Sequence, residues 1–299
     1  MVNYRTKSRV VFNIFNYFFL LFLSITIILP FVNAFALSLS DPDAISKGVV
    51  GLAPVGFNFK SYIMIFRDRL FLFSVRNTIL LTVVNTCLVI LVALSAASAL
   101  ASKHFRGVKI AYFYSLIPMY FGGGLIPSYL WMNDLHLRNS MLVMILPVIT
   151  NVFLIVIFRN TIMQLPAEMR ESAEIDGGGE LIIMFRIVMP LIMPTVIAFV
   201  IFNAVGYWNE WFNCMIYIQD PYKFTLQYKL REILTTNDLQ NMIAAKGGAS
   251  GIAKSLKDMV HPQNLRMAAL LVTILPIMII YPFLQKYFIH GVIVGAVKG

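Results

Sequence analysis

An unusual concentration of acidic side chains lies in and beside the stretch "MRESAEIDGGGELIIMFRIVMPLIMP", residues 169–194. Five of the chain's 14 acidic residues fall there, at Glu168, Glu171, Glu174, Asp176 and Glu180. The first three recur at every third position, so they share one side of a helix. Such a face can attract a basic soluble partner, although charges on a solvated surface helix need no partner.

Helix start and stop signals surround these acids. Pro166 can begin a helix, Ala173 is small enough for close approach, and the glycine triplet at 177–179 ends the helix sharply. A second helix is expected to follow, and Pro190 and Pro194 mark its entry into an apolar segment. The positions expected on the apolar side of that second helix are Ile182, Ile183, Phe185 and Ile187.

Composition identifies a membrane protein. The 299 residues are 59% hydrophobic with a mean hydropathy of +0.78, and 13% are charged, against about 25% in soluble domains. The net charge of +10 fits basic flanks of membrane helices beside anionic lipid, and no basic run indicates nucleic-acid binding. Cys87 and Cys214 lie in apolar segments, which predicts buried packing thiols, not a disulfide or a metal site.

Six charge-free windows are each long enough to cross a bilayer, since a spanning helix needs roughly 20 apolar residues. The first window begins after Arg5, Lys7 and Arg9 and has no clear small-residue cleavage site. We therefore expect a retained helix and not a removed signal peptide. The windows cover residues 10–40, 77–102, 110–133, 139–158, 187–209 and 267–285.

Six spans put both termini on the same side of the membrane. The basic residues at the N-terminus and in the short loop 103–109, which has no acidic residue, place both termini in the cytoplasm by the positive-inside rule. The chain is then a multi-pass protein of the plasma or inner membrane. The acidic stretch falls on the cytoplasmic side, between the fourth and fifth spans.

Two larger segments are expected outside. Residues 41–76 include the amphipathic run "GFNFKSYIMIF", and residues 219–266 include "TLQYKLREILTTNDLQ", which is typical of a helix. The later "GASGIAKS" (248–255) resembles a phosphate-binding loop, but Ala253 stands where the second glycine is needed. Ser250 lies in a polar loop without a histidine partner, so an intramembrane serine protease is also disfavoured.

The outer end of the fifth window carries side chains that suit a sugar, because aromatic plates and amide groups match its flat faces and hydroxyls. Counted from Pro194, Glu210 lies about 24 Å along a helix, near the outer boundary. An interfacial aromatic belt with a snorkelling acid explains these residues equally well. The candidate translocation-path residues are Asn203, Tyr207, Trp208, Asn209, Glu210 and Trp211, with Tyr129 and Trp131 at the outer end of the third window.

The acidic stretch resembles the EAA loop of type I permeases of ATP-binding-cassette (ABC) importers. That pattern is Glu-Ala-Ala, three residues, Gly, nine residues, Ile, one residue and Leu-Pro. With every spacing kept, this chain has Glu171-Ser172-Ala173, Gly177, Ile187 and Met189-Pro190. Ser172 and Met189 depart from the pattern by small steps in size.

This resemblance implies an all-α membrane protein with six transmembrane helices and a cytoplasmic coupling helix. The loop would dock into a cleft on a cytoplasmic ATPase subunit, with Glu171 and Ala173 facing the ATPase and Gly177 making the turn. The implied organisation is an N-terminal helix with an external segment (1–72), a permease domain (73–284) that contains the coupling loop (166–190), and a cytoplasmic tail (285–299). The implied ATPase-coupling residues are Glu171, Ser172, Ala173, Asp176, Gly177, Ile187 and Pro190.

Three further segments resemble the carbohydrate branch of these importers, the maltose-permease-like and polysaccharide-derived oligosaccharide permeases. They are "FGGGLIPSYLWMNDLHLRNS" (121–140), "NAVGYWNEWFNCMIYI" (203–218) and "QKYFIHGVIVGAVKG" (285–299). The branch implies a second homologous permease, two ATPase subunits that bind ATP and magnesium, an external sugar-binding protein and an oligosaccharide cargo. The chain itself would be non-catalytic and bind no cofactor. The loop 219–266 would help to release ligand from the binding protein, unless it is a structural cap, and the tail would reach between the ATPase subunits.

Two other functions stay open on the sequence. The same architecture could carry amino acids, phosphate or metal, because the coupling loop alone does not identify the cargo. An ion-gradient transporter is disfavoured, because paired broken helices and intramembrane ionisable groups are not evident in both halves. No Lys or Arg lies inside any of the six windows, so this chain offers no deep cation for an acidic sugar.

Overall fold

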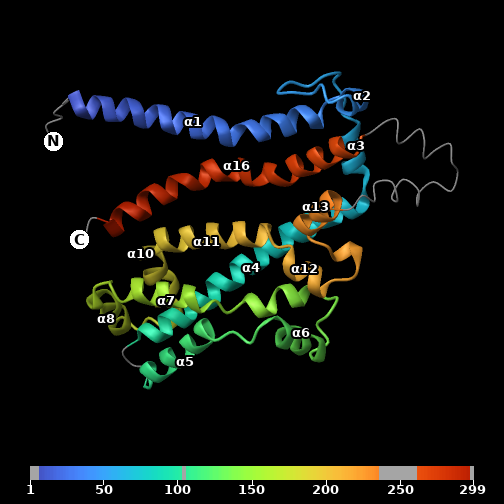
Figure 1. The fold of residues 1–299 in the computed structure, drawn as a ribbon. Helices are drawn as coiled ribbons and strands as arrows, with labels where there is room; N and C mark the ends of the chain where they lie inside the picture. Colours follow the sequence, from blue (N-terminus) through green and yellow to red (C-terminus); the bar gives the residue numbers. More distant parts are fainter. Residues whose placement is uncertain (1–6, 103–105, 236–260, 297–299) are drawn as a thin grey trace. The chain divides into compact units, whose positions relative to one another are not determined.

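The computed structural model describes residues 7–102, 106–235 and 261–296, with side chains as far as residue 282 (Figure 1). Throughout these described ranges the regular elements are helices, which confirms the predicted all-α class. The chain divides into two compact units. One comprises residues 1–68 with 232–274, and the other residues 69–231 with 275–299.

The first unit joins the end of α1 (Lys7–Ser38) to the start of α16 (Pro262–Ala296). The Asn264 side chain, 1% exposed, donates hydrogen bonds to the carbonyl oxygens of Leu37, Ser38 and Ser40 at 2.8, 3.1 and 3.0 Å. These carbonyls lie at and beyond the end of α1, where the helix provides no partner of its own. A buried amide therefore ties the two helices together.

Two short helices follow α1 in the first unit. They are α2 (Pro42–Ser46) and α3 (Lys60–Arg67). In α3, Ser61 and Ile65 are buried whereas Ile63 and Phe66 are exposed. Residues 60–66 of the run "GFNFKSYIMIF" thus form a helix with one buried and one exposed side, which confirms its amphipathic character.

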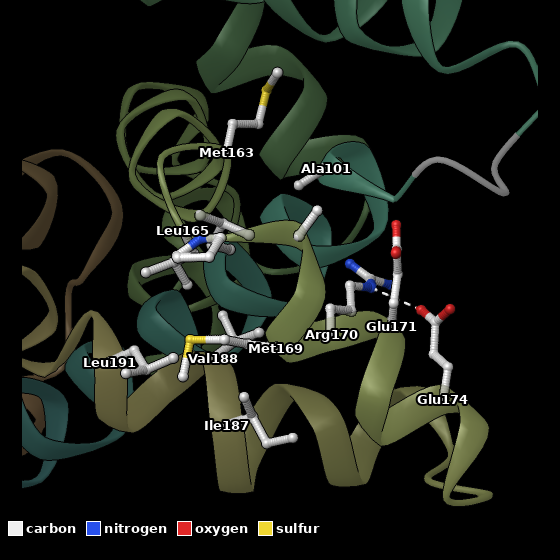
Figure 2. Close-up of a pocket in the computed structure, with 13 residues that line it drawn as sticks. Ala101, Met163, Leu165, Met169, Arg170, Glu171, Glu174, Ile187, Val188 and Leu191 are labelled. Atoms are coloured by element: carbon white, nitrogen blue, oxygen red, sulfur yellow. Dashed lines mark hydrogen bonds and ion pairs between the residues drawn. The ribbon is translucent and has the colours of Figure 1, made fainter.

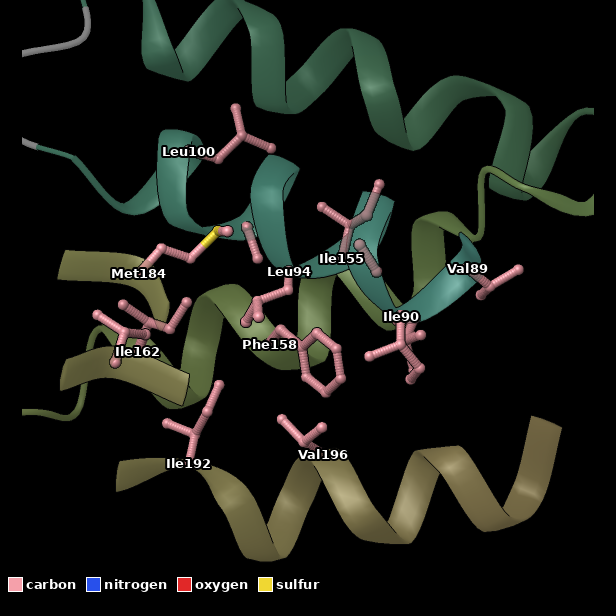
Figure 3. Packing of buried hydrophobic residues seen from close by; sticks show 14 of the residues in the cluster. Val89, Ile90, Leu94, Leu100, Ile155, Phe158, Ile162, Met184, Ile192 and Val196 are labelled. Carbon is pink, nitrogen blue, oxygen red and sulfur yellow. The ribbon is translucent and has the colours of Figure 1, made fainter. Parts of the chain in front are cut away.

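The second unit is organised around α4 (Arg69–Ala101), which packs against α7 (Val152–Ile162) and α11 (Met193–Trp208). Ala93 and Ala97 of α4 are fully buried, and such small side chains let helix backbones approach closely. The larger side chains of Leu94, Phe158 and Ile192 fill the space between the helices (Figure 3).

Shorter elements connect these helices. Before α7 they are α5 (Val108–Tyr120), α6 (Leu125–Asp134) and the 3₁₀ turns η1 (Met141–Met144) and η2 (Leu146–Val148). Between α7 and α11 they are α8 (Ala167–Ile175), α9 (Glu180–Ile183), the π-helical turn η3 (Met184–Val188) and α10 (Met189–Leu191). After α11 come α12 (Phe212–Tyr217), the 3₁₀ turn η4 (Pro221–Lys223) and α13 (Leu226–Thr235).

Five of the six predicted windows coincide with candidate spans in the described residues. Four are helical stretches long and apolar enough to cross a membrane, at Lys7–Ser38, Arg69–Ala101, Met141–Ile162 and Pro262–Pro282. The fifth is the pair Glu180–Leu191 and Met193–Trp208, bent by 87°. Pro190 and Pro194 flank this bend, and a proline inside a helix removes a hydrogen bond and forces a kink.

The third window, at 110–133, is divided and not one continuous helix. α5 and α6 are separated by residues 121–124, and Gly124 has a φ of +83°. Three consecutive glycines disfavour helix, because glycine loses the most backbone entropy on ordering. The interruption therefore follows from the "FGGG" sequence itself.

The predictions for the two cysteines and for the loop 219–266 have mixed outcomes. Cys214 is fully buried as predicted, but Cys87 is exposed, because it lies off the face of α4 that carries Val89 and Ala93. The helix predicted in "TLQYKLREILTTNDLQ" is confirmed as α13 up to Thr235. Residues 236–260, including "GASGIAKS", lie outside the described residues.

We expect Phe158→Ala to destabilise the second unit by about 3–5 kcal/mol, because removing a fully buried ring leaves a cavity. Thermal unfolding of the purified chain in detergent measures the effect. Phe113→Ala is the matched control, since that ring is 70% exposed on α5, and it should lower the midpoint much less. Equal losses from the two substitutions would contradict the packing described.

Candidate functional site

The acidic stretch folds as a helix, a glycine turn and a second helix, as predicted. α8 follows Pro166 and ends before Gly177, whose φ is +80°. The amide of Gly177 donates to the carbonyl of Glu174 at 3.1 Å, and the amide of Gly178 donates to that of Ala173 at 2.9 Å. This pair of bonds is a Schellman motif, which needs a residue that tolerates positive φ at position 177.

Gly178 is needed for a different reason, because other atoms of the loop lie too close to this position to leave room for a side chain. A Cβ at this position would lie 2.8 Å from the carbonyl oxygen of Ala173 and 3.5 Å from Cγ1 of Ile183. That oxygen is held in place because it accepts the Gly178 amide. Gly179 has open space around it and an extended backbone, with φ of −68° and ψ of 156°. This position therefore needs glycine neither for its φ nor for space.

One guanidinium joins the two helices of the loop. Arg170 Nε donates to Glu174 Oε1 at 3.0 Å, and its Nη2 donates to the two carboxylate oxygens of Glu180 at 2.7 and 2.6 Å. The Arg170 side chain is 18% exposed. Glu174 of the predicted acidic face is therefore paired with Arg170, and the other two members, Glu168 and Glu171, are exposed.

A cavity of about 210 Å³ lies behind α8. Figure 2 shows Met163, Leu165 and Leu191 on its apolar side and Arg170 with Glu174 on its polar side. α8 is thus held to the rest of the unit at its turn and through its ion pairs, with empty space along part of its inner side.

The residues predicted to couple to an ATPase divide into two groups. Ala173 is half-buried against the hydrophobic cluster that contains Ile183, and Ile187 lines the cavity. These two therefore belong to the inner side of the loop. The exposed members are Glu171, Ser172, Asp176, Gly177 and Pro190, of which Glu171 also lines the cavity.

The second helix of the loop buries a face that differs from the predicted one. Ile183 is buried as expected, but Ile182 and Phe185 are 52% and 43% exposed. Met184 and Val188 are buried in their place. The π-helical turn η3 explains the difference, because a wider turn shifts which residues share a side of the helix.

The two aromatic candidates on α6 lie in different surroundings. Tyr129 stacks on Tyr217 with ring centroids 5.9 Å apart, and the guanidinium of Arg138 lies 5.9 Å from the Tyr129 ring. Burial, and secondarily Tyr129, raise the pKa of Tyr217. Trp131 is 61% exposed. Of the pair, Trp131 is the one open to a ligand.

The candidates within α11 are partly engaged by their own helix. The Asn203 side chain donates to the carbonyl of Phe199 at 2.8 Å. Tyr207 is half-buried, and Trp208 is 9% exposed. Trp208 is therefore a packing residue in the structure, and its ring face is not available to a sugar.

The candidates just after α11 form a cross-linked corner. The Asn209 side chain accepts a hydrogen bond from Gln227 at 2.9 Å. The Glu210 carboxylate accepts hydrogen bonds from the backbone amide and the side-chain amide of Asn213, at 2.8 and 3.0 Å. The guanidinium of Arg231 lies 3.8 Å from the ring of Trp211, close enough for a cation–π contact. These contacts link the C-terminal end of α11 to α12 and α13.

Sequence reasoning missed two arginines. Arg159 lies inside the span Met141–Ile162, although the predicted window stopped one residue before it. Its Nε donates to the carbonyl of Leu100 at 3.0 Å and its guanidinium lies 4.2 Å from the ring of Tyr112. Arg170 could have been found from its i,i+4 spacing to Glu174, which is a helical ion-pair signal.

Among the described residues, the candidate site is therefore the acidic helix–turn–helix that leads into a bent apolar span. The sequence profile of the family described as "binding-protein-dependent transport system inner membrane component" matches residues 3–294, nearly the whole chain. The chain belongs to this family. It is a multi-pass membrane permease of the ABC importer type, and such permease subunits are not enzymes.

Individual relatives cover the same length. The permease is 34% identical to protein LplC of Bacillus subtilis over 99% of this chain and 98% of LplC. It is 31% identical to the polygalacturonan/rhamnogalacturonan transport system permease protein YtcP of the same organism, over 98% of this chain and all of YtcP. A solved chain from a bacterial ABC transporter involved in the import of the acidic polysaccharide alginate is similar with a TM-score of 0.85 and 27% identity, covering 96% of this chain and 100% of that one.

We expect Gly178→Ala to destabilise the loop 166–190 and Gly179→Ala to be tolerated. The first substitution sets a methyl group against a fixed carbonyl oxygen, whereas the second meets open space. A cost of about 1–3 kcal/mol is typical of such overpacking. Amide hydrogen exchange across residues 167–183 measures it, and equal protection in the two variants would contradict the close approach at Gly178.

Proposed function

We propose that this permease forms, with a second homologous permease, the translocation path of an ABC importer for oligosaccharides. An external binding protein delivers the sugar. Two ATPase subunits on the cytoplasmic side bind ATP and magnesium and drive the cycle. The permease binds no cofactor itself, and both of its termini lie in the cytoplasm.

The observation that carries this proposal is the position of α8. This helix of nine residues exposes Glu168 and Glu171 and leads through the glycine turn into the bent span Glu180–Trp208. An exposed acidic helix suits a cleft with basic side chains on a soluble partner. Movement of α8 would reach α11 through the 87° bend.

The proposed cargo class rests on the relatives and on the outer side chains together. YtcP is named for polygalacturonan and rhamnogalacturonan, and the similar solved transporter for alginate, all of which are carboxylated polysaccharides. In this permease the exposed Trp131 and the half-buried Tyr207 offer aromatic faces for sugar rings. Arg159 is already engaged by Leu100 and Tyr112, so we do not assign it to cargo.

Glu171→Lys tests the coupling role. We expect ATPase subunits to co-purify with the unmodified permease from cells that express the whole system. Reversing this exposed charge should lower their recovery, or their stimulation by the binding protein, by roughly tenfold or more, because like charges then face each other. Asp134→Lys is the matched control, since it makes the same charge change at an exposed site on α6.

Two outcomes of that experiment would oppose the proposal. If Asp134→Lys lowers ATPase recovery as much as Glu171→Lys does, the loss does not come from α8. If no ATPase co-purifies with the unmodified permease, the importer assembly itself is wrong. An ion-gradient transporter would then become the leading hypothesis.

Trp131→Ala and Trp208→Ala separate a cargo contact from a packing role. We expect Trp131→Ala to lower the sugar transport rate by about two- to tenfold, the effect of one lost aromatic contact, without changing the thermal midpoint. Trp208→Ala should lower the midpoint, because its ring is 9% exposed. Transport at the unmodified rate by Trp131→Ala would remove this residue from the path.

A further inference from the structure

The residues that connect α8 to the span after it are, by their sequence, flexible. Residues 177–179 are three consecutive glycines, and glycine has the largest backbone freedom of any residue. A force applied to α8 could therefore rotate the helix about this turn and leave the span where it is. Efficient transmission needs a second connection between α8 and the helix beyond the turn.

Arg170 provides a connection of this kind. Its guanidinium bonds Glu174 on its own helix and both carboxylate oxygens of Glu180, the first residue of α9. A guanidinium that donates to two carboxylates has its orientation fixed as well as its position. The bonds to Glu180 cross the glycine turn, whereas the bond to Glu174 stays within α8.

Packing alone does not supply the same support. The cavity of about 210 Å³ lies along the inner side of α8, and Arg170 and Glu174 are among the residues that line it (Figure 2). Ala173 contacts the hydrophobic cluster near the turn. The residues of α8 that lie farther from the turn therefore depend more on the Arg170 ion pairs.

We propose that Arg170 is a positioning residue that braces α8 against α9 across the glycine turn, so that displacement of α8 moves the bent span. The proposal deepens the coupling role of the loop and rests on that proposed function. The Glu180 side chain is 61% exposed in the isolated chain, where water weakens an ion pair. Docking of a partner over the loop would exclude water and strengthen it.

The bracing itself is tested on the full chain in lipid nanodiscs, without any partner. Nitroxide labels at Glu168→Cys on α8 and Leu91→Cys on α4, in a Cys87→Ser background, report the spread of distances between α8 and the core. We expect Arg170→Met to broaden this distribution clearly and Glu180→Gln to broaden it less. Glu174→Gln removes an ion pair of Arg170 that does not cross the turn, so it should broaden the distribution least.

The coupling role is tested on the co-purified complex without labels. We expect ATPase subunits to stay bound to the Arg170→Met permease, because Glu168 and Glu171 are unchanged. Stimulation of ATP hydrolysis by the binding protein should fall by about tenfold, since the substitution leaves two carboxylates without their cation. Glu180→Gln should lower stimulation by about two- to fivefold, the range for an exposed pair. Arg170→Lys should lie between Arg170→Met and the unmodified protein, because lysine lacks the forked donors.

The results distinguish the two proposals. The bracing role of Arg170 is wrong if the distance distribution between the labels stays narrow in Arg170→Met, or if Glu174→Gln and Glu180→Gln broaden it equally. This conclusion holds even if the ATPase assembles normally. A broadened distribution with unchanged stimulation shows a structural contact only and overturns the positioning role. Absence of ATPase from the unmodified complex overturns the proposed function, and with it the coupling role of Arg170.

Discussion

Close packing of α4 against α7 and α11 is the contact on which the second unit depends. In lipid, spanning segments gain little from burial of apolar surface against one another, so small side chains and tight contacts must hold them together. Ala93 and Ala97 allow that approach, and Phe158 fills the space beside them. α11 is the second helix of the bent pair, so this packing holds one end of the bent span in place.

Packing is uneven within the loop 166–190, because Ile183, Met184 and Val188 are buried in the core whereas no residue of α8 is buried. Its turn is set by backbone bonds at Gly177 and by the space available at Gly178. Its charges differ in their surroundings, because Glu168 and Glu171 are exposed while Glu174 and Glu180 bind Arg170. A loop with an exposed acidic side and an internally paired side can meet a partner and still keep its shape. Internal pairing also reduces the charge repulsion that a row of carboxylates would otherwise produce.

The C-terminal end of α11 differs from the loop, because its functional groups are engaged within the protein. Its polar and aromatic side chains bind one another, so Asn209 meets Gln227, Trp211 meets Arg231, and Trp208 is buried. Each of these polar groups therefore has a partner within the protein. The sequence indicated eight residues whose side chains suit sugar binding. Several of them instead contact other residues of the protein, whereas Trp131 is exposed.

Local features of the sequence determined the class of protein, five of the spans and the helix–turn–helix of the coupling loop, because hydropathy, proline and glycine act over neighbouring residues. Motif spacing also identified the family from residues 171–190. Only the tertiary structure decided that Arg170 crosses the glycine turn to Glu180, that Trp208 is buried, and that Cys87 is not. The physical reason is that partner choice and burial depend on how whole helices pack and bend, and a π-helical turn or an 87° kink redirects side chains whose local pattern looks regular.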